Sequence, residues 1–359
     1  MEFVAFLLIL SVLVLVHEWG HYITAKMFGV RVDEFGIGLP PRAKKLFVRK
    51  GTLFSLNWLP LGGFVKLHGE TYDESVEGIE DRNAFWSKSL IQRLVILISG
   101  VVMNFVFGVA VFAIVYSFLG IPTQTDKVKI TDVEAGAPAD QIGLKKDDLV
   151  KQFKVEDQVT DITSVEQLVR LINENKGREV ELQVEDEQGT RKISAVPRVD
   201  PPAGEGALGI ALSHIEMKKY PAWQMPFRGM VVGMKEATAW GKEILNGLYR
   251  MVSGLWQGRG VPEDVAGPVG IYQVSAQVFR FGLLPLLQFM GILSINLAIL
   301  NILPIPALDG GRVAFLGIEA LVGRKLKNRI EGITHTVGMI ILLSLMILIT
   351  IRDVARLLI

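Results

Sequence analysis

Four long apolar stretches dominate the hydropathy pattern of the chain. They run from about Phe3 to Ala25, Leu94 to Leu119, Leu283 to Leu303 and Ile333 to Ile351. As a helix rising about 1.5 Å per residue, each is about long enough to cross roughly 30 Å of hydrocarbon, the longer ones with some tilt. The pattern therefore predicts a polytopic α-helical membrane protein with about four transmembrane helices.

The residues between the second and third stretches follow a different pattern. Polar and apolar residues alternate at 128–133, 180–184 and 191–196, which predicts strands, while residues 165–173 repeat with the period of a helix. We therefore expect an inserted α+β domain. The predicted divisions are an N-terminal membrane core (1–122), the insert (123–215), an amphipathic helix with a linker (216–282) and a C-terminal membrane core (283–359).

Two other segments fit neither pattern. Glycine and proline punctuate the residues from Arg31 to Leu67, where 53–59 and 64–67 are typical of short strands around a Pro/Gly turn. The hairpin lies either at membrane depth beside the first helix or on the surface. Residues 226–255 have the spacing of an amphipathic helix, which either rests on the membrane or packs on the insert.

Basic residues orient the predicted spans. Lysine and arginine crowd the segment between the first two stretches and the short loop between the last two. By the positive-inside rule both segments are cytoplasmic, so the insert and both termini lie outside. The net charge of +1 gives no long-range field that favours nucleic acid.

The sequence HExxH, from His17 to His21, ends the first apolar stretch. Thirteen of the fourteen residues from Phe3 to Val16 are aliphatic or aromatic. On a helix His17 and His21 share one face and can bind one zinc ion, while Glu18 can take a proton from zinc-bound water. A charged residue costs roughly 2.5–3.5 kcal/mol near the centre of a membrane helix and usually marks function. The alternative is a cluster of polar residues at a helix end.

The chain contains no cysteine, so a zinc site must use His, Asp and Glu. Two histidines leave the metal one protein ligand short. Asp309 is the candidate, because it lies near the predicted cytoplasmic end of the third stretch, on the same side as the histidines. Pro304 and Pro306 break the helix and free the chain to bend. Asp-Gly-Gly alone is typical of a turn; beside HExxH the ligand interpretation is favoured.

Several motifs together resemble those of the site-2 proteases, a family of intramembrane zinc metalloproteases. They are HExxH, N-x-x-P-x-P-x-L-D-G-G at 301–311, P-L-G-G-F-V-K at 60–66 and G-P-V-G-I at 267–271. The likeness is to the bacterial branch of regulated intramembrane proteolysis with a PDZ domain between its second and third core helices. The insert resembles a single PDZ domain at residues 136–150, but Asp147 stands where that family usually has glycine.

The resemblance implies roles for particular residues. His17, His21 and Asp309 resemble the zinc ligands and Glu18 the general base. Asn301 and the strand residues Gly62, Gly63 and Phe64 resemble groups that bind substrate. Asn104 matches a position in the second helix, for which an interhelical hydrogen bond is the favoured interpretation. Surface or interface roles are favoured for the remaining histidines, His68, His214 and His335.

The implied function is a zinc endopeptidase that cleaves the transmembrane segments of single-pass proteins, such as anti-sigma factors or remnant signal peptides. The resemblance also implies a multi-pass protein of the bacterial plasma membrane, with the active site toward the cytoplasm and the PDZ-like insert outside. The alternative is a non-catalytic membrane scaffold that binds extracytoplasmic peptide tails through the insert.

Overall fold

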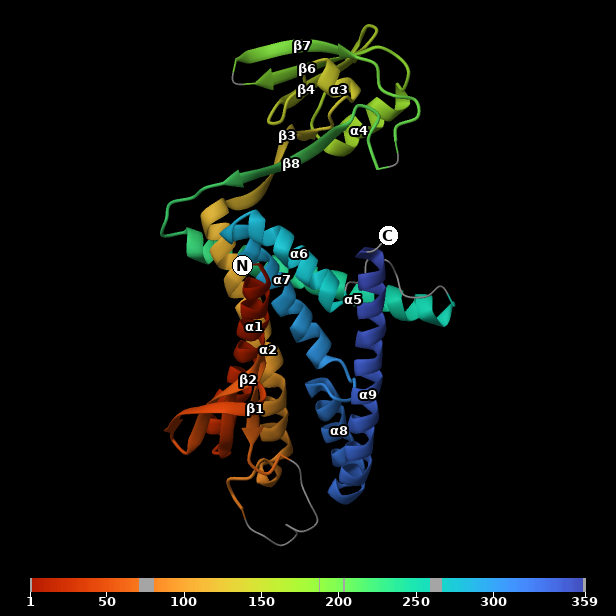
Figure 1. Ribbon diagram of the computed structural model, residues 1–359. Helices are drawn as coiled ribbons and strands as arrows, with labels where there is room; N and C mark the ends of the chain where they lie inside the picture. Colours follow the sequence, from red (N-terminus) through yellow and green to blue (C-terminus); the bar gives the residue numbers. More distant parts are fainter. Residues whose placement is uncertain (1, 71–80, 187, 203, 259–266, 358–359) are drawn as a thin grey trace. The chain divides into compact units, whose positions relative to one another are not determined.

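The computed structural model describes residues 2–70, 81–186, 188–202, 204–258 and 267–357 (Figure 1). The chain divides into two compact units. One comprises Met1–Phe118 with Ala222–Ile359, and the other comprises Leu119–Pro221. The first unit carries the predicted membrane helices and the second carries the insert.

Four helices of the described residues are long and apolar enough to cross a membrane, as predicted. They are α1 (Glu2–Met27), α2 (Leu90–Leu119), α7 (Leu283–Ile302) and residues Gly332–Ala355 of α9 (Arg324–Leu357). α1 and α2 lie side by side (Figure 1), because glycines replace larger side chains where they cross. A Cβ on Gly20 would lie 2.4 Å from the Ser99 carbonyl oxygen. This close crossing brings the HExxH segment against α2.

An antiparallel pair of strands, β1 (Val32–Arg49) and β2 (Thr52–Leu67), packs on α1. The expectation of two short strands around a Pro/Gly turn is wrong, because 53–59 and 64–67 belong to the single strand β2 and the hairpin turn lies at Lys50 and Gly51. Gly36 of β1 pairs with both Ser55 and Phe64, so the start of β1 lies between the two ends of β2.

The last part of β2 is an edge of this sheet. Residues 63–67 pair with β1 on one side, and no further strand pairs with them in the described part of the chain. Aromatic rings hold the sheet on α1. Phe35 lies edge-on to Trp19 and Tyr22, with ring centroids 5.9 and 5.7 Å away. The edge therefore lies beside the helix that carries HExxH.

The amphipathic helix predicted at 226–255 is α5 (Met225–Trp256). It belongs to the first unit and packs on α7 and on α2, where a Cβ on Gly233 would lie 2.6 Å from the Val109 carbonyl oxygen.

Two helices occur where a linker and a short loop were expected. α6 (Pro268–Arg280) begins within the predicted linker, and its first N–H groups, from Gly267 and Gly270, donate to the Asp353 carboxylate of α9. α8 (Asp309–Val322) fills much of the predicted loop between the last two spans. Both helices pack on neighbours that sequence periodicity does not reveal.

The second unit is a sheet of six strands in the order β7-β6-β4-β3-β8, with β5 paired to β4. The strands are β3 (Ile121–Val133), β4 (Leu149–Val155), β5 (Gln158–Asp161), β6 (Val180–Asp186), β7 (Gly189–Ala195) and β8 (Ile210–Lys218). Helices α3 (Pro138–Gln141) and α4 (Val165–Glu174) complete it. The three predicted strands and the predicted helix are confirmed; assignment as a PDZ domain stays a prediction.

Asp147 occupies a tight turn of this unit with φ at +79°. This is the left-handed conformation that glycine adopts most readily. The Asp147 carboxylate pairs with Lys129 at 2.7 Å. The aspartate therefore adopts the conformation that a glycine at this position would favour.

Candidate metal centre

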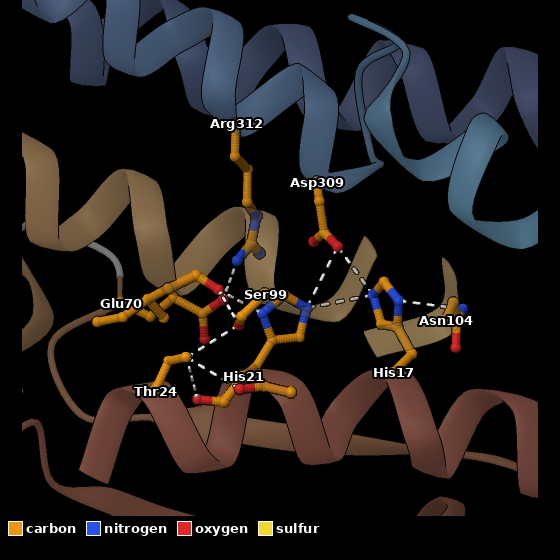
Figure 2. Close-up of polar contacts among 10 residues, drawn as sticks. His17, His21, Thr24, Glu70, Ser99, Asn104, Asp309 and Arg312 are labelled. Atoms are coloured by element: carbon orange, nitrogen blue, oxygen red, sulfur yellow. Dashed lines mark hydrogen bonds and ion pairs between the residues drawn. The ribbon is translucent and has the colours of Figure 1, made fainter. Parts of the chain in front are cut away.

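The two histidines of HExxH and Asp309 converge on one point (Figure 2). α1 continues unbroken to Met27, so His17 and His21 lie one helical turn apart, with their Nε2 atoms separated by 3.1 Å. The Oδ2 atom of Asp309 lies 2.8 Å from His17 Nε2 and 3.2 Å from His21 Nε2. These three side chains form a group that can hold a metal ion. Two imidazole nitrogens and one carboxylate, with a fourth position open to water, suit catalytic zinc.

The break after α7 places Asp309 at this point. Helix α7 ends at Ile302, and α8 begins at Asp309 itself. In between, Ala307 has φ at +75°, and its N–H donates to His335 Nδ1 of α9 at 2.8 Å. A Cβ on Gly310 would lie 2.3 Å from the Ile302 carbonyl oxygen, so this glycine is required by a close backbone approach. His335, expected at a surface or interface, helps to shape the loop that precedes Asp309.

A second set of contacts holds α8 against α2. The Arg93 guanidinium donates to both carboxylate oxygens of Glu319, at 2.9 and 2.5 Å, and both side chains are buried. Arg312, also on α8, pairs with Glu70 just after β2 (Figure 2). Because α8 carries Asp309 at its start, these pairs help to fix the third candidate ligand. No pattern in the sequence indicated these pairs.

Helix α2 orients the His21 ring and leaves no space beneath either ring. His21 Nδ1 lies 2.8 Å from the carbonyl oxygen of Ile96. A carbonyl only accepts hydrogen bonds, so Nδ1 carries a proton, and Nε2, which faces Asp309, is the ring nitrogen that a metal could use. Gly100 lies under the rings, because a Cβ there would be 2.5 Å from His21 Nε2 and 2.7 Å from His17 Nε2.

Two of the three converging side chains, His17 and Asp309, line a cavity of about 220 Å³. Its lining combines residues that the sequence singled out with others that it did not: Val14, His17, Glu18, Asn104, Leu297, Asn301, Ala307, Leu308 and Asp309. The structure thus brings Glu18 and Asn301 into the same cavity as two of the three candidate ligands. The apolar wall, Val14, Leu297 and Leu308, had no signal beyond general hydrophobicity.

The edge of β2 passes close to this cavity. A Cβ on Gly62 would lie 3.2 Å from the Val14 side chain, and one on Gly63 would lie 2.9 Å from Leu15, on the turn of α1 that precedes His17. The backbone N–H of Val65 lies near the Glu18 carboxylate. The Phe64 side chain instead lies over Gly36 and does not line the cavity. The backbone of 62–65, rather than the Phe64 ring, therefore lies beside the candidate site.

Helices that can span a membrane, with a His, His, Asp centre and a glutamate beside it, define a membrane metalloprotease. A model of Peptidase family M50 matches residues 5–345, and the chain belongs to this family, the site-2 proteases.

Curated relatives align over nearly their whole length. Zinc metalloprotease RasP of Oceanobacillus iheyensis is 30% identical, covering 99% of each chain. A putative zinc metalloprotease of Clostridium acetobutylicum is 33% identical, covering 97% of this chain and 96% of the relative. RasP of Geobacillus kaustophilus is 27% identical, covering 98% and 97%. The chain is thus a zinc metalloprotease located in a membrane.

Proposed function

We propose that this zinc metalloprotease hydrolyses peptide bonds within the membrane-spanning segments of single-pass proteins. In this proposal His17, His21 and Asp309 are the zinc ligands and Glu18 is the general base. The observation that carries the proposal is the convergence of the three candidate ligands at a cavity that Glu18 also lines, among helices long and apolar enough to span a membrane. The donor set fits zinc, with two nitrogens, one oxygen and one position left open.

The residues of the chain divide the work of hydrolysis. Zinc bound at this centre supplies a Lewis acid that polarises the scissile carbonyl and lowers the pKa of bound water to about 7. Glu18 accepts the proton of the attacking water and passes it to the leaving amine. The Glu18 carboxylate lies in the lining of the cavity, with the Val65 N–H of β2 nearby.

The substrate must expose its backbone before it can be cut. A transmembrane helix encloses its amides in hydrogen bonds four residues apart, and lipid offers no replacement partners. The outer edge of β2 offers backbone groups at Gly62, Gly63 and Phe64, next to the cavity. In our proposal the unwound substrate pairs with this edge as an added strand, and the Asn301 carboxamide holds it near the metal.

The cellular setting follows from charge. Basic residues flank the ends of α1 and α7 at which the centre lies, which favours a site on the cytoplasmic side of the membrane. The PDZ-like insert then lies outside. We therefore propose regulated intramembrane proteolysis in a bacterial plasma membrane, with substrates such as anti-sigma factors or remnant signal peptides.

The variant Glu18→Gln tests the proposal. The purified protein in detergent is incubated with a single-pass membrane substrate, and products are mapped by mass spectrometry while bound zinc is measured. We expect Glu18→Gln to keep the zinc content of the parent and to lose turnover by about 10²–10⁴-fold. The exposed Glu174→Gln on α4 is the matched control and should cleave normally.

Two outcomes would refute this assignment. The first is a Glu18→Gln protein that cleaves at the parental rate, because Glu18 would then take no part in the reaction. The second is a parent protein that cleaves the substrate only outside the transmembrane segment of that substrate.

A further inference from the structure

Asn104 of α2 has an unusual environment for a membrane helix. Its side chain is completely buried and lines the cavity of the metal centre. The Nδ2 atom lies 3.4 Å from Nδ1 of His17 (Figure 2). The Oδ1 atom is buried and has no hydrogen-bond partner among the described residues. A buried polar atom left unpaired costs about 1–3 kcal/mol, so this arrangement of the amide is unfavourable.

The proton on the His17 ring decides which way the amide faces. His17 Nε2 points at Asp309 Oδ2 and His21 Nε2, so a metal held there needs the lone pair of Nε2. The ring proton then sits on Nδ1, which becomes a donor. Two donors, Nδ1–H and Nδ2–H, cannot bond to each other.

A half-turn of the Asn104 amide gives a partner both to its oxygen and to the His17 ring proton. The oxygen and nitrogen of an asparagine side chain are nearly the same size, and their assignment follows from their partners. With the two exchanged, the carbonyl oxygen accepts the His17 Nδ1–H and is no longer unpaired.

We propose that Asn104 is a positioning residue for the metal centre, whose Oδ1 accepts the Nδ1–H of His17 and holds Nε2 toward the metal. This inference rests on the proposed zinc site and deepens it. Helix α2 then orients both rings, His21 through the Ile96 carbonyl and His17 through Asn104. The interhelical hydrogen bond that the sequence predicts for Asn104 is thus made to His17, one of the candidate zinc ligands.

The backbone of Asn104 gives its side chain a fixed support. The Ser294 hydroxyl of α7 donates to the Asn104 carbonyl oxygen at 2.8 Å, and Ser294 is fully buried. This bond joins α2 to α7 without using the carboxamide. The carboxamide is thus left for His17, and the two roles of Asn104 can be separated by substitution.

Zinc binding by the metal-free protein tests the proposal. The purified full chain in detergent is stripped with a chelator, its zinc affinity is measured by competition with a chromophoric chelator, and the visible spectrum is recorded with Co²⁺. We expect Asn104→Leu and Asn104→Ala each to lower zinc affinity by about 10–100-fold and to alter the Co²⁺ bands. Asn104→Asp keeps an acceptor at the same place and should restore parental affinity to within about threefold.

The control is Ser294→Ala, which removes the bond to the Asn104 backbone and leaves the carboxamide and the ring untouched. It should bind zinc like the parent.

Three results would overturn the inference alone: parental affinity and spectrum in both Asn104→Leu and Asn104→Ala, no recovery in Asn104→Asp, or an equal loss in Ser294→Ala. A parent that binds no zinc would overturn the proposed centre as well, so the two failures are distinguishable.

Discussion

Adding one methyl group at Gly100 should damage the metal centre more than any other single methyl in α2. The Cβ of Gly100→Ala would lie 2.5 Å from His21 Nε2 and 2.7 Å from His17 Nε2. Ordinary contact begins at 3.4 Å, so the overlaps are 0.9 Å (3.4 − 2.5) and 0.7 Å (3.4 − 2.7). The rings cannot turn away freely, because Ile96 and Asp309 hold them.

Two consequences follow from this overlap. Pushing α1 away from α2 should lower the free energy of unfolding by about 1–3 kcal/mol, the usual effect of overpacking a core. The displacement of the donor atoms also exceeds the tolerance of about 0.2 Å in a metal site, so we expect zinc affinity to fall by at least about tenfold. Each tenfold loss removes about 1.4 kcal/mol from the stabilisation that saturating zinc gives the folded protein.

Thermal unfolding in detergent, with and without a chelator, separates these effects. The metal-free comparison reports the packing cost, and the shift on adding zinc reports affinity. Gly317→Ala is the matched control, because a Cβ on this residue of α8 would have no atom within 4 Å. It should raise stability by about 0.5–1 kcal/mol, the helical gain of alanine over glycine. A Gly100→Ala protein with parental zinc affinity would refute the geometry.

Two further predictions concern charges outside the centre. Arg93→Met or Glu319→Leu alone should lower the free energy of unfolding by about 3–5 kcal/mol, because each leaves a buried charge unpaired. The double variant should recover most of this loss. Denaturant unfolding of the parent and the three variants measures the coupling, and additive losses would contradict the prediction. The Arg42 guanidinium, opposed by burial, holds the pKa of Glu34 below its ordinary value of 4.5. Ionised Glu34 therefore stabilises the folded protein fully above pH 4.5, and this stabilisation is lost as the pH falls through the lowered pKa. Glu34→Gln should be less stable than the parent at pH 7 and should approach it in acid; an unchanged gap in thermal unfolding would contradict this.

Local patterns in the sequence determined the features that depend on neighbouring residues. Hydropathy alone located all four candidate spans, and the i, i+4 spacing of His17 and His21 placed both rings on one helical face. Alternation located strands of the insert. The prolines of the 301–311 motif correctly indicated a break after the third span. Such features need no knowledge of what packs against them.

Only the tertiary structure decided which residues surround the histidines. Helix α1 is apolar on nearly all sides up to Val16, so its sequence does not show which side faces α2 or the sheet. The Ile96 carbonyl, the Gly100 backbone and the Asn104 side chain reach the histidines only because glycines let α1 and α2 approach closely.

The sequence likewise did not show how α8 and the β1–β2 sheet pack against the rest of the protein. Asp309 lies 288 residues beyond His21 and meets it through a bend between α7 and α8 and through the Arg93–Glu319 pair, 226 residues apart. The free edge at 63–67 arises because β2 folds around the start of β1, a pairing that alternation cannot specify. Contacts between distant residues depend on which faces pack together, and a uniformly apolar membrane helix carries no periodic signal of that choice.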